Sequence, residues 1–345
     1  MFTITDRDIC TVLHDYGIQT EGISFVELER YHYEEEDPES RQVRVIVKVS
    51  LQENRSLVLR FKNEDDAPQD VLEAQSRFAA LLYSQGIVTP KVYESGGIYA
   101  RHYVMNGYDV IVTVEDFEDG EIKGVDPETA AETGALLAKM HNIAENADYH
   151  VHSAVLFDPL DRNELFSFEE FDKHKDTMLA IDSNLYHSIV HQHDGLVSQI
   201  RSLGDEPRYA VQGDISDCNL YRTQDGKLGI FDFNRCGDNS LFFDTVMQAV
   251  FEARLMEYPD DAAGNREEVI LTSFLNGYQQ IRPFSEAQKG AFPYLYALIN
   301  AFWLGDIQWN EDSLAKAIES GNSGAAHTWM KEIYKREQSL LTMPV

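Results

Sequence analysis

Apolar and polar residues alternate along much of the first third of the chain. The alternation runs over residues 23–33 and 43–51, and a short run of β-forming residues follows at 56–61. A period of two is typical of strands that bury one face. The acidic segment 34–40 and the polar segment 52–55 are typical of loops and turns. We therefore expect these runs to form a small antiparallel sheet.

The apolar spacing changes to a helical one at residues 70–85. Leu72, Phe78 and Leu82 recur at the intervals of a helix face, and Gly86 is typical of the residue that ends a helix. Two further strands are predicted at residues 91–94 and 110–114. The polar stretch 118–121 then interrupts the pattern, so we expect two parts of the protein, at residues 1–115 and 116–345.

The second part has a mainly helical pattern. Asp126 is a good N-cap with Pro127 in the first turn, which predicts a helix that extends to about residue 144. Further helices are predicted near residues 167–180, 184–203, 240–257, 265–281, 285–304 and 311–341. A β-hairpin interrupts them, with strands at 219–221 and 228–233 joined by a turn at Asp225 and Gly226.

The predicted hairpin carries the residues that best indicate a function. Asp214 precedes Asn219 by five residues, and Asp232 ends the apolar return strand. A carboxylate on a loop can accept the proton of a hydroxyl, whereas an amide and a second carboxylate offer oxygen ligands to Mg²⁺. Phosphoryl transfer needs an oriented hydroxyl and cations that neutralise the phosphates. Because a hairpin brings its two ends together, we expect Asn219 and Asp232 to share an ion beside Asp214.

These residues resemble the motifs of a known family. The segment Gln-Gly-Asp-Ile-Ser-Asp-Cys-Asn at 212–219, followed by Ile-Phe-Asp-Phe at 230–233, is similar to the catalytic and metal-binding motifs of the aminoglycoside phosphotransferase and choline kinase-like family. Leu-Leu-Ala-Lys-Met-His at 136–141 and the pair Phe243-Asp244 match more weakly. The resemblance implies an α+β, protein-kinase-like bilobal fold. Its small antiparallel-sheet lobe would be residues 1–115, and its larger helical lobe, residues 116–345, would carry the hairpin and the acceptor site.

The resemblance also implies roles in the second half of the chain. It makes Asp214 the catalytic base, and it makes Asn219 and Asp232 the ligands of Mg²⁺. The reaction implied is the transfer of a phosphoryl group from ATP to a hydroxyl of a small molecule, with an aminoglycoside-, homoserine-, choline- or sugar-like acceptor. Asp244 is interpreted as a structural residue below the catalytic loop.

Further roles fall in the first 117 residues. Arg60 occupies the position of the family's phosphate-binding lysine, although Lys62 points to the same face by strand alternation and could take that role instead. Glu73 matches the family's helix glutamate, which would brace the cation. The connector resembles the family's hinge, where the residues expected to bind adenine through backbone groups are Glu115, Asp116 and Phe117.

The sequence departs from the family pattern at two places that matter for the reaction. Gln212 stands where the family usually has histidine, and the acidic first loop contains no glycine. These departures motivate an alternative, a catalytically inactive pseudokinase that serves as a binding or scaffold module. A third interpretation is a metal-dependent phosphohydrolase that needs no ATP.

Composition narrows the partners of the protein. The 345 residues contain 59 Asp and Glu against 29 Lys and Arg, which gives a formal net charge of −30. A surface this acidic repels nucleic acid and anionic lipid, whereas an amine-bearing acceptor is compatible with it. No apolar run reaches the roughly 20 residues of a membrane helix, and the three cysteines have no metal-like spacing. We therefore expect a soluble cytoplasmic protein.

Overall fold

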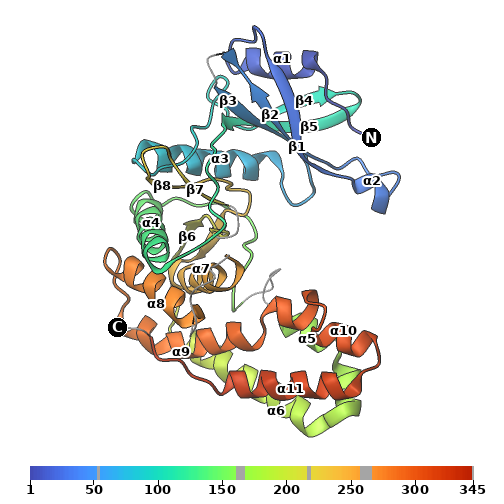
Figure 1. Ribbon diagram of the computed structural model, residues 1–345, viewed down its shortest axis with the longest axis vertical. Coiled ribbons are helices and arrows are strands. Elements are labelled where there is room, and N and C mark those ends of the chain that lie inside the picture. Colours follow the sequence, from blue (N-terminus) through green and yellow to red (C-terminus); the bar gives the residue numbers. More distant parts are fainter. Residues whose placement is uncertain (53–54, 161–167, 216–218, 257–265, 344–345) are drawn as a thin grey trace. The chain divides into compact units, whose positions relative to one another are not determined.

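The computed structural model describes residues 1–52, 55–160, 168–215, 219–256 and 266–343 (Figure 1). The chain divides into two compact units. Unit 1 comprises Met1–Ile122, Tyr149–Ser153 and Cys218–Cys236, and unit 2 comprises Lys123–Asp148, Ala154–Asp217 and Gly237–Val345. None of the described helices is both long enough and apolar enough to cross a membrane.

Unit 1 is built on a five-stranded antiparallel sheet. Its strands, in the order β1-β2-β3-β5-β4 across the sheet, are β1 (Ser24–Tyr31), β2 (Val43–Ser50), β3 (Ser56–Asn63), β5 (Tyr108–Asp116) and β4 (Arg101–Met105). The three strands predicted before residue 62 and the one at 110–114 are confirmed. So is the helix predicted at 70–85, which is α3 (Gln69–Ser84) and ends before Gly86, a residue with φ of 85°.

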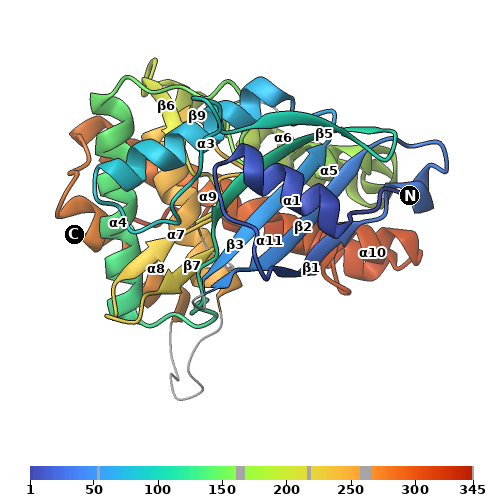
Figure 2. The same cartoon turned by 90° about the horizontal axis from the view of Figure 1, so that it is seen from above.

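One face of the sheet forms the core of unit 1. Helix α1 (Asp6–Asp15) lies over this face, as the view from above shows (Figure 2). The alternating valines of β2 point toward α1 because side chains on a strand alternate between its faces. They pack with residues of α1, β3 and β5 in one cluster that includes Val45, Val47, Leu59, Phe61 and Val112. The polar residues between them therefore fall on the opposite face.

Unit 1 differs from the predictions in two helices that were not expected, α1 and α2 (Tyr33–Glu36), and in its strands. Helix α2 occupies the start of the acidic segment that was expected to form a loop. Residues 91–94 form no strand, and only a single bridge joins Val92 to Glu115. A strand that was not predicted, β4, instead pairs with β5 through a turn at Asn106 and Gly107, whose φ angles are 52° and 79°. An Asn-Gly pair is a strong hairpin signal because both residues tolerate positive φ, and the sequence carries that signal.

The predicted β-hairpin is present and belongs to unit 1. Its strands β7 (Leu220–Arg222) and β8 (Leu228–Ile230) pair antiparallel across the turn at Asp225 and Gly226, where Gly226 has φ of 82°. Three backbone bonds tie the hairpin to the rest of the unit, one of which runs from Arg222 N to Gly120 O over 2.9 Å. Ile122 N donates to Leu220 O over 2.9 Å, and Ile230 N donates to Val88 O over 3.0 Å.

Unit 2 is mainly helical. Its elements are α4 (Pro127–Asn146), α5 (Phe168–Lys173), α6 (Lys175–Arg201), α7 (Leu241–Leu255), α8 (Arg266–Gln279), α9 (Glu286–Ala301), the π-helix η2 (Gly305–Trp309), α10 (Leu314–Glu319), α11 (Ser323–Glu337) and the paired short strands β6 (Arg208–Val211) and β9 (Gly237–Ser240). Figure 1 shows α6 and α11 side by side. Asp126 caps α4 as predicted, since its side chain accepts from Thr129 N over 2.7 Å.

The helix predicted at residues 311–341 is in fact two helices. Gly321, with φ of 71°, separates α10 from α11, because the left-handed conformation ends a helix. The break predicted between residues 180 and 184 corresponds to Asp182, which has non-helical angles inside α6.

Helices α4 and α8 cross at very short distance, and glycine permits the approach. A Cβ atom at Gly134 would lie 2.0 Å from Phe274 O, and one at Gly277 would lie 1.9 Å from Ala131 O. Both obstacles are backbone atoms of the facing helix. The two glycines therefore fix the spacing of this helix pair.

We predict that Gly277→Ala lowers the stability of the protein. The added methyl group would force the two helix backbones apart, which costs at least about 2 kcal/mol, and urea unfolding at constant pH would measure the loss. Gly290→Ala in α9 is the matched control. A Cβ atom there meets nothing within 4 Å, so that variant should keep its stability or gain up to about 1 kcal/mol. Equal stability of the two variants would contradict the packing role of Gly277.

Glu337 supplies a second prediction. Its side chain is fully buried near the end of α11, and neither carboxylate oxygen has a hydrogen-bond partner among the described residues. Burial raises the pKa of Glu337 to about 9. Between pH 5 and pH 9 the folded protein therefore keeps a proton that the unfolded chain releases. Its stability should fall as pH rises, by up to about 1.4 kcal/mol per pH unit.

The difference between wild type and Glu337→Gln isolates this effect. Below about pH 5 the stabilities of the two proteins should change with pH in the same way. Between about pH 5 and pH 9 the wild type should lose stability that the variant keeps, so the difference in stability between the variant and the wild type should grow with pH. Denaturant unfolding at several pH values measures the slope. Glu332→Gln is the control, because that carboxylate pairs with Arg336 over 3.2 Å and its pKa is lowered. Parallel curves for wild type and Glu337→Gln would refute the buried proton.

Candidate active site

The face of the sheet opposite α1 carries ordered rows of side chains. Directly paired residues of antiparallel strands point to the same face. The pairing of β1, β2, β3 and β5 therefore sets out three rows: first Val26, Lys48, Val58 and Glu115; second Glu29, Ile46, Arg60 and Thr113; third Tyr31, Arg44, Lys62 and Ile111. Each row holds at least one aliphatic side chain and one cation, and the third row holds two cations, Arg44 and Lys62. The face thus offers both apolar contacts and positive charge, which suit a ligand with an apolar part and an anionic part.

Arg60 lies between two carboxylates. Its Nη1 donates to Glu115 Oε1 over 2.6 Å, and its Nη2 lies 3.7 Å from Asp232 Oδ2. The Arg60 side chain is only 11% exposed. Burial alone would lower the pKa of Arg60, but the two carboxylates outweigh burial and raise the pKa. The guanidinium is therefore a permanent charge at this site.

Lys62, the second candidate cation, faces the same segment. Its Nζ donates to Asn234 Oδ1 over 2.8 Å and lies 3.8 Å from Glu64 Oε2. Burial of the side chain lowers the pKa of Lys62 to about 8. Both predicted phosphate-binding candidates thus lie against residues 232–234, because Arg60 is close to Asp232 and Lys62 bonds to Asn234.

Asp232 has a strained backbone and an ionised side chain. Its φ of 58° lies in the left-handed region, which non-glycine residues rarely adopt and which is frequent at functional sites. Its Oδ1 accepts from Asn234 N over 3.0 Å. Burial acts to raise the pKa of Asp232, but Arg60, the Asn234 N–H group and Lys62 together lower it. The carboxylate is thus charged, as a metal ligand must be.

Asn219 stands at the open end of the same hairpin. Its carbonyl accepts from Phe231 N over 3.0 Å, so it lies across the hairpin from the residue before Asp232. An amide and a carboxylate are hard oxygen ligands that fit Mg²⁺, which typically takes one or two carboxylates together with substrate phosphates. Within the described ranges no group of three or more His, Cys, Asp or Glu side chains could hold a metal. Asn219 and Asp232 therefore suit a metal ion whose remaining ligands come from the phosphates of a substrate.

The expected brace between Glu73 and the cation is not what the structure shows. The Glu73 carboxylate accepts from Tyr99 N and Ala100 N, over 2.8 and 2.7 Å, and lies 2.7 Å from Arg77. The α3 residues that line a small cavity with Arg60 are instead Leu72, Gln75, Ser76 and Ala79. One residue step turns a helix by about 100°, and position 73 therefore faces away from Arg60.

The connector offers fewer free backbone groups than the hinge prediction assumed. Asp116 N donates to Lys91 O and Phe117 N donates to Ser56 O, each over 2.9 Å. Glu115 belongs to β5, and its side chain accepts a hydrogen bond from Arg60. Adenine would therefore have to use carbonyl groups of this segment or the amide of Glu118, the first residue beyond these two bonds.

In unit 2 a buried hydrogen-bond network holds the loop of Asp214. Gly213 has φ of 82°, and Asp214 N donates to the side chain of Gln212 over 2.8 Å. Gln212 is fully buried, so the amide that replaces the family's histidine positions the loop directly. Ile215 N donates to Gln248 Oε1 over 2.9 Å. Residues 216–218 lie outside the described part of the chain.

The network continues into three helices. Gln248 Nε2 donates to Asp244 Oδ1 over 3.1 Å, and the other Asp244 oxygen lies 3.0 Å from His141 Nε2. His141 Nδ1 in turn lies 2.9 Å from the hydroxyl of Tyr278. Burial lowers the pKa of His141. Asp244 is thus structural, as interpreted, but it reaches the loop through Gln248 instead of accepting the loop's own N–H groups.

Of the aromatic side chains in residues 292–309, two lie in the core and three others, Tyr294, Tyr296 and Trp303, are half-buried. Phe292 and Phe302 are buried, whereas Trp309 is 62% exposed. Glu252, on the neighbouring helix α7, is fully buried, and burial raises its pKa well above the usual range. A neutral buried carboxyl cannot attract the amine of an acceptor.

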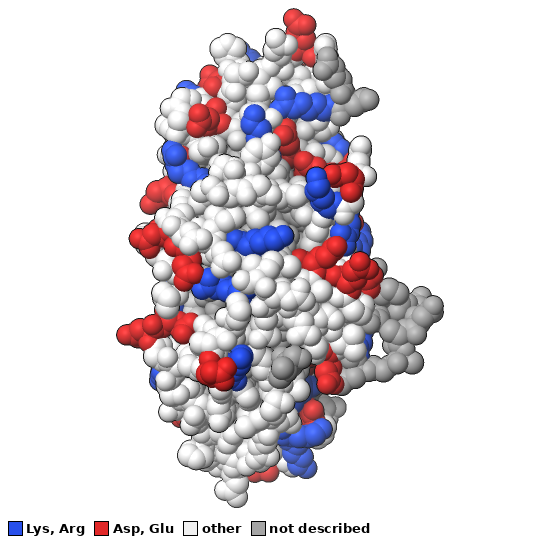
Figure 3. All heavy atoms as spheres, turned by 90° about the vertical axis from the view of Figure 1, so that its left-hand side faces the viewer, with Lys and Arg blue, Asp and Glu red and all other residues white. Residues whose placement is uncertain are grey.

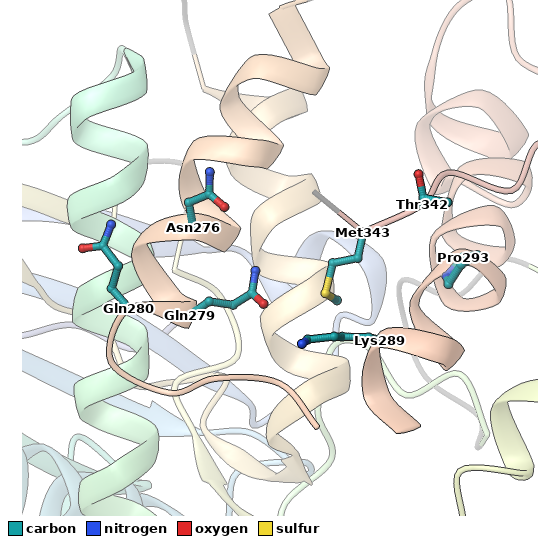
Figure 4. A pocket seen from close by; sticks show the side chains of 7 residues that line it. All are labelled: Asn276, Gln279, Gln280, Lys289, Pro293, Thr342 and Met343. Atoms are coloured by element: carbon teal, nitrogen blue, oxygen red, sulfur yellow. The ribbon is translucent and has the colours of Figure 1, made fainter. Parts of the chain in front are cut away.

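A separate cavity of about 620 Å³ lies in unit 2. Figure 4 shows the side chains around it, which come from α8 and the residue that follows it, from α9 and from the C-terminal segment: Asn276, Gln279, Gln280, Lys289, Pro293, Thr342 and Met343. None of them belongs to the network that holds Asp214. On the face seen in Figure 3, basic side chains are interspersed among acidic ones, so the negative charge is not gathered in one patch there.

Comparison with known proteins decides the family. The profile of the phosphotransferase enzyme family matches residues 39–284. The chain belongs to the phosphotransferase enzyme family. This match covers more than half of the chain and includes strands β2 to β5 of the sheet, the hairpin and the network around Asp214. It confirms the predicted family and enzyme class, and it gives no support to the alternative of an inactive binding module.

Solved structures confirm the α+β, protein-kinase-like fold. A microcompartment-associated aminopropanol kinase aligns with a TM-score of 0.61 at 14% identity, over 96% of this chain and 99% of that chain. An amicoumacin kinase solved with AMP-PNP and Ca²⁺ aligns with 0.61 at 15%, over 96% and 94%. An aminoglycoside 2′-phosphotransferase solved with GDP aligns with 0.52 at 14%, over 96% and 95%. No curated protein sequence matches the chain.

The phosphotransferase offers a test of the loop network. We predict that Gln248→Leu leaves the buried Ile215 N–H group without its partner, which costs about 1–3 kcal/mol of stability and lowers the rate of phosphoryl transfer. Chemical denaturation and turnover measurements would test both effects. Gln280→Leu, at an exposed position of unit 2, is the control and should leave both unchanged. Wild-type stability of Gln248→Leu would show that the network does not hold the loop.

Proposed function

We propose that this phosphotransferase transfers the γ-phosphoryl group of ATP to a hydroxyl of a small molecule. The observation that carries the proposal is Asp232, which is ionised and strained at the end of the hairpin, lies 3.7 Å from Arg60 and has its pKa lowered by the charges of Arg60 and Lys62. A charged carboxylate beside two cations has the chemistry of a site for metal-bound phosphates. The amicoumacin kinase solved with AMP-PNP and Ca²⁺ supports the choice of an adenine nucleotide and a divalent metal.

The residues take distinct roles in this proposal. Asn219 and Asp232 would hold Mg²⁺, and Arg60 and Lys62 would bind the phosphates. When bound, Mg²⁺ neutralises the negative charge on the phosphates. Asp214 would accept the proton of the acceptor hydroxyl and orient its oxygen for attack. Since five residues lead from Asp214 to Asn219, the chain limits their separation to at most roughly 18 Å.

The acceptor we propose is a hydroxyl compound that also bears an amine. Two structural relatives are named for such molecules, aminopropanol and an aminoglycoside. The net charge of −30 favours the approach of cationic compounds over anionic ones. A coupled ADP-release assay with panels of amino alcohols, aminoglycosides, sugars and hydroxy amino acids would identify the class.

Controls in the same assay separate the alternatives. Phosphate release from simple esters without ATP would favour a phosphohydrolase. Failure of Mg·ATP to stabilise the protein against heat would contradict nucleotide binding. If only neutral sugars released ADP, the amine in the proposed acceptor would be wrong, while the proposed reaction would stand.

We predict that Asp214→Asn abolishes most of the turnover. Loss of the base should lower kcat by about 10²-fold or more, and the dissociation constant of Mg·ATP should change little because Asp214 would not contact the nucleotide. Initial rates and equilibrium titration measure the two quantities. Asp205→Asn, at an exposed position of unit 2, is the matched control with an unchanged kcat. A fully active Asp214→Asn variant would overturn the role of this residue.

A further inference from the structure

We infer that the side chain of Glu115, on strand β5, is the positioning residue for Arg60 and takes the place of the helix glutamate. The inference rests on the proposed function, because it concerns the cation that would bind the phosphates. Arg60 Nη1 donates to Glu115 Oε1 over 2.6 Å. The two side chains are 11% and 18% exposed. A short charge-assisted bond in a largely buried setting holds a side chain in one orientation.

The sheet register places Glu115 where it can do this. Arg60 pairs directly with Thr113, and Glu115 pairs with Val58, so Glu115 is the diagonal neighbour of Arg60 on the same face. Diagonal neighbours in a sheet are within reach of long side chains. The backbone of two hydrogen-bonded strands thus fixes both partners, and the contact requires no particular placement of α3.

The α3 glutamate is already committed to other groups. The Glu73 carboxylate bonds to the N–H groups at the start of β4 and to Arg77. The α3 side chains at the small cavity beside Arg60 are instead those of Leu72, Gln75, Ser76 and Ala79, none of which carries a charge. Among the described residues, the carboxylates that pair with Arg60 are those of Glu115 and Asp232.

Glu115 also limits the contact between Arg60 and Asp232. The guanidinium contacts both carboxylates. Its nitrogen atoms lie 2.6 Å from Glu115 Oε1 and 3.7 Å from Asp232 Oδ2. A guanidinium released from Glu115 would bind Asp232 through two parallel hydrogen bonds, since arginine matches a carboxylate in that way. Those bonds would occupy the oxygens that the proposed metal needs. Glu115 therefore keeps Arg60 available for phosphate and Asp232 available for the cation.

A double-mutant experiment on the full chain tests the inference by binding and not by turnover. The variants are Glu115→Gln, Arg60→Gln, the combination of both, and Glu73→Gln as the matched control. A fluorescent ATP analogue with Mg²⁺ is titrated at a temperature well below every melting temperature, which calorimetry supplies. A variant that merely folds less well then keeps its affinity.

We predict that Glu115→Gln raises the dissociation constant about tenfold, the equivalent of one charge-assisted bond. Glu73→Gln should raise it less than twofold. In the Arg60→Gln background, Glu115→Gln should have no further effect, because the residue acts through Arg60.

Three results would overturn the inference. They are a wild-type affinity for Glu115→Gln, additive effects of Glu115→Gln and Arg60→Gln, and a loss for Glu73→Gln as large as that for Glu115→Gln. The wild-type titration separates this failure from that of the proposed function. A wild-type protein that binds no nucleotide would refute both, whereas nucleotide binding that is indifferent to Glu115 would refute the inference alone.

Discussion

Charges that are largely removed from water have to be matched by opposite charges nearby, and this constraint shapes the candidate site of unit 1. Arg60 and Lys62 would each be costly to bury alone, because low-dielectric surroundings disfavour an unpaired ion. They are tolerated because the hairpin delivers Asp232 and strand β5 delivers Glu115. The same cluster keeps Asp232 ionised. The register of β3 against β5 and one β-hairpin thus place these opposite charges next to one another.

The loop of Asp214 depends on neutral hydrogen bonds instead. Gln212 and Gln248 accept hydrogen bonds from successive N–H groups of the loop. Gln248 in turn donates to Asp244, and Asp244 contacts His141. A rigid loop matters because a general base must be held in the geometry of its reaction. Gln212 supports the loop directly, since its amide oxygen accepts from Asp214 N over 2.8 Å.

Much of the fold could be predicted from the sequence, because strand alternation, helix periodicity and turn residues are local signals. Asn219 and Asp232 were predicted at the ends of one hairpin from the pattern between them. The partner of Arg60 could not be predicted in this way. It depends on the register of β3 against β5 and on the rotation of α3, and neither is encoded in a short segment. The resemblance to the family favoured Glu73, but in the structure the rotation of about 100° per residue around α3 turns that side chain to Tyr99, Ala100 and Arg77.

The charge balance of the sheet face bears on the proposed binding of a nucleotide together with a metal. The face and its immediate neighbours carry four cations, Arg44, Lys48, Arg60 and Lys62, against four carboxylates, Glu29, Glu64, Glu115 and Asp232. Arg44 lies 3.1 Å from Glu29, and Lys62 lies 3.8 Å from Glu64. The acidic segment at residues 34–40, which begins within the short helix Tyr33–Glu36, adds no positive charge and no glycine. A polyanionic nucleotide bound as proposed would therefore meet a nearly neutral surface and would have to bring its own counter-ion. The inferred restraint of Arg60 by Glu115 would keep a second guanidinium contact off the Asp232 carboxylate, which would take part in holding that ion.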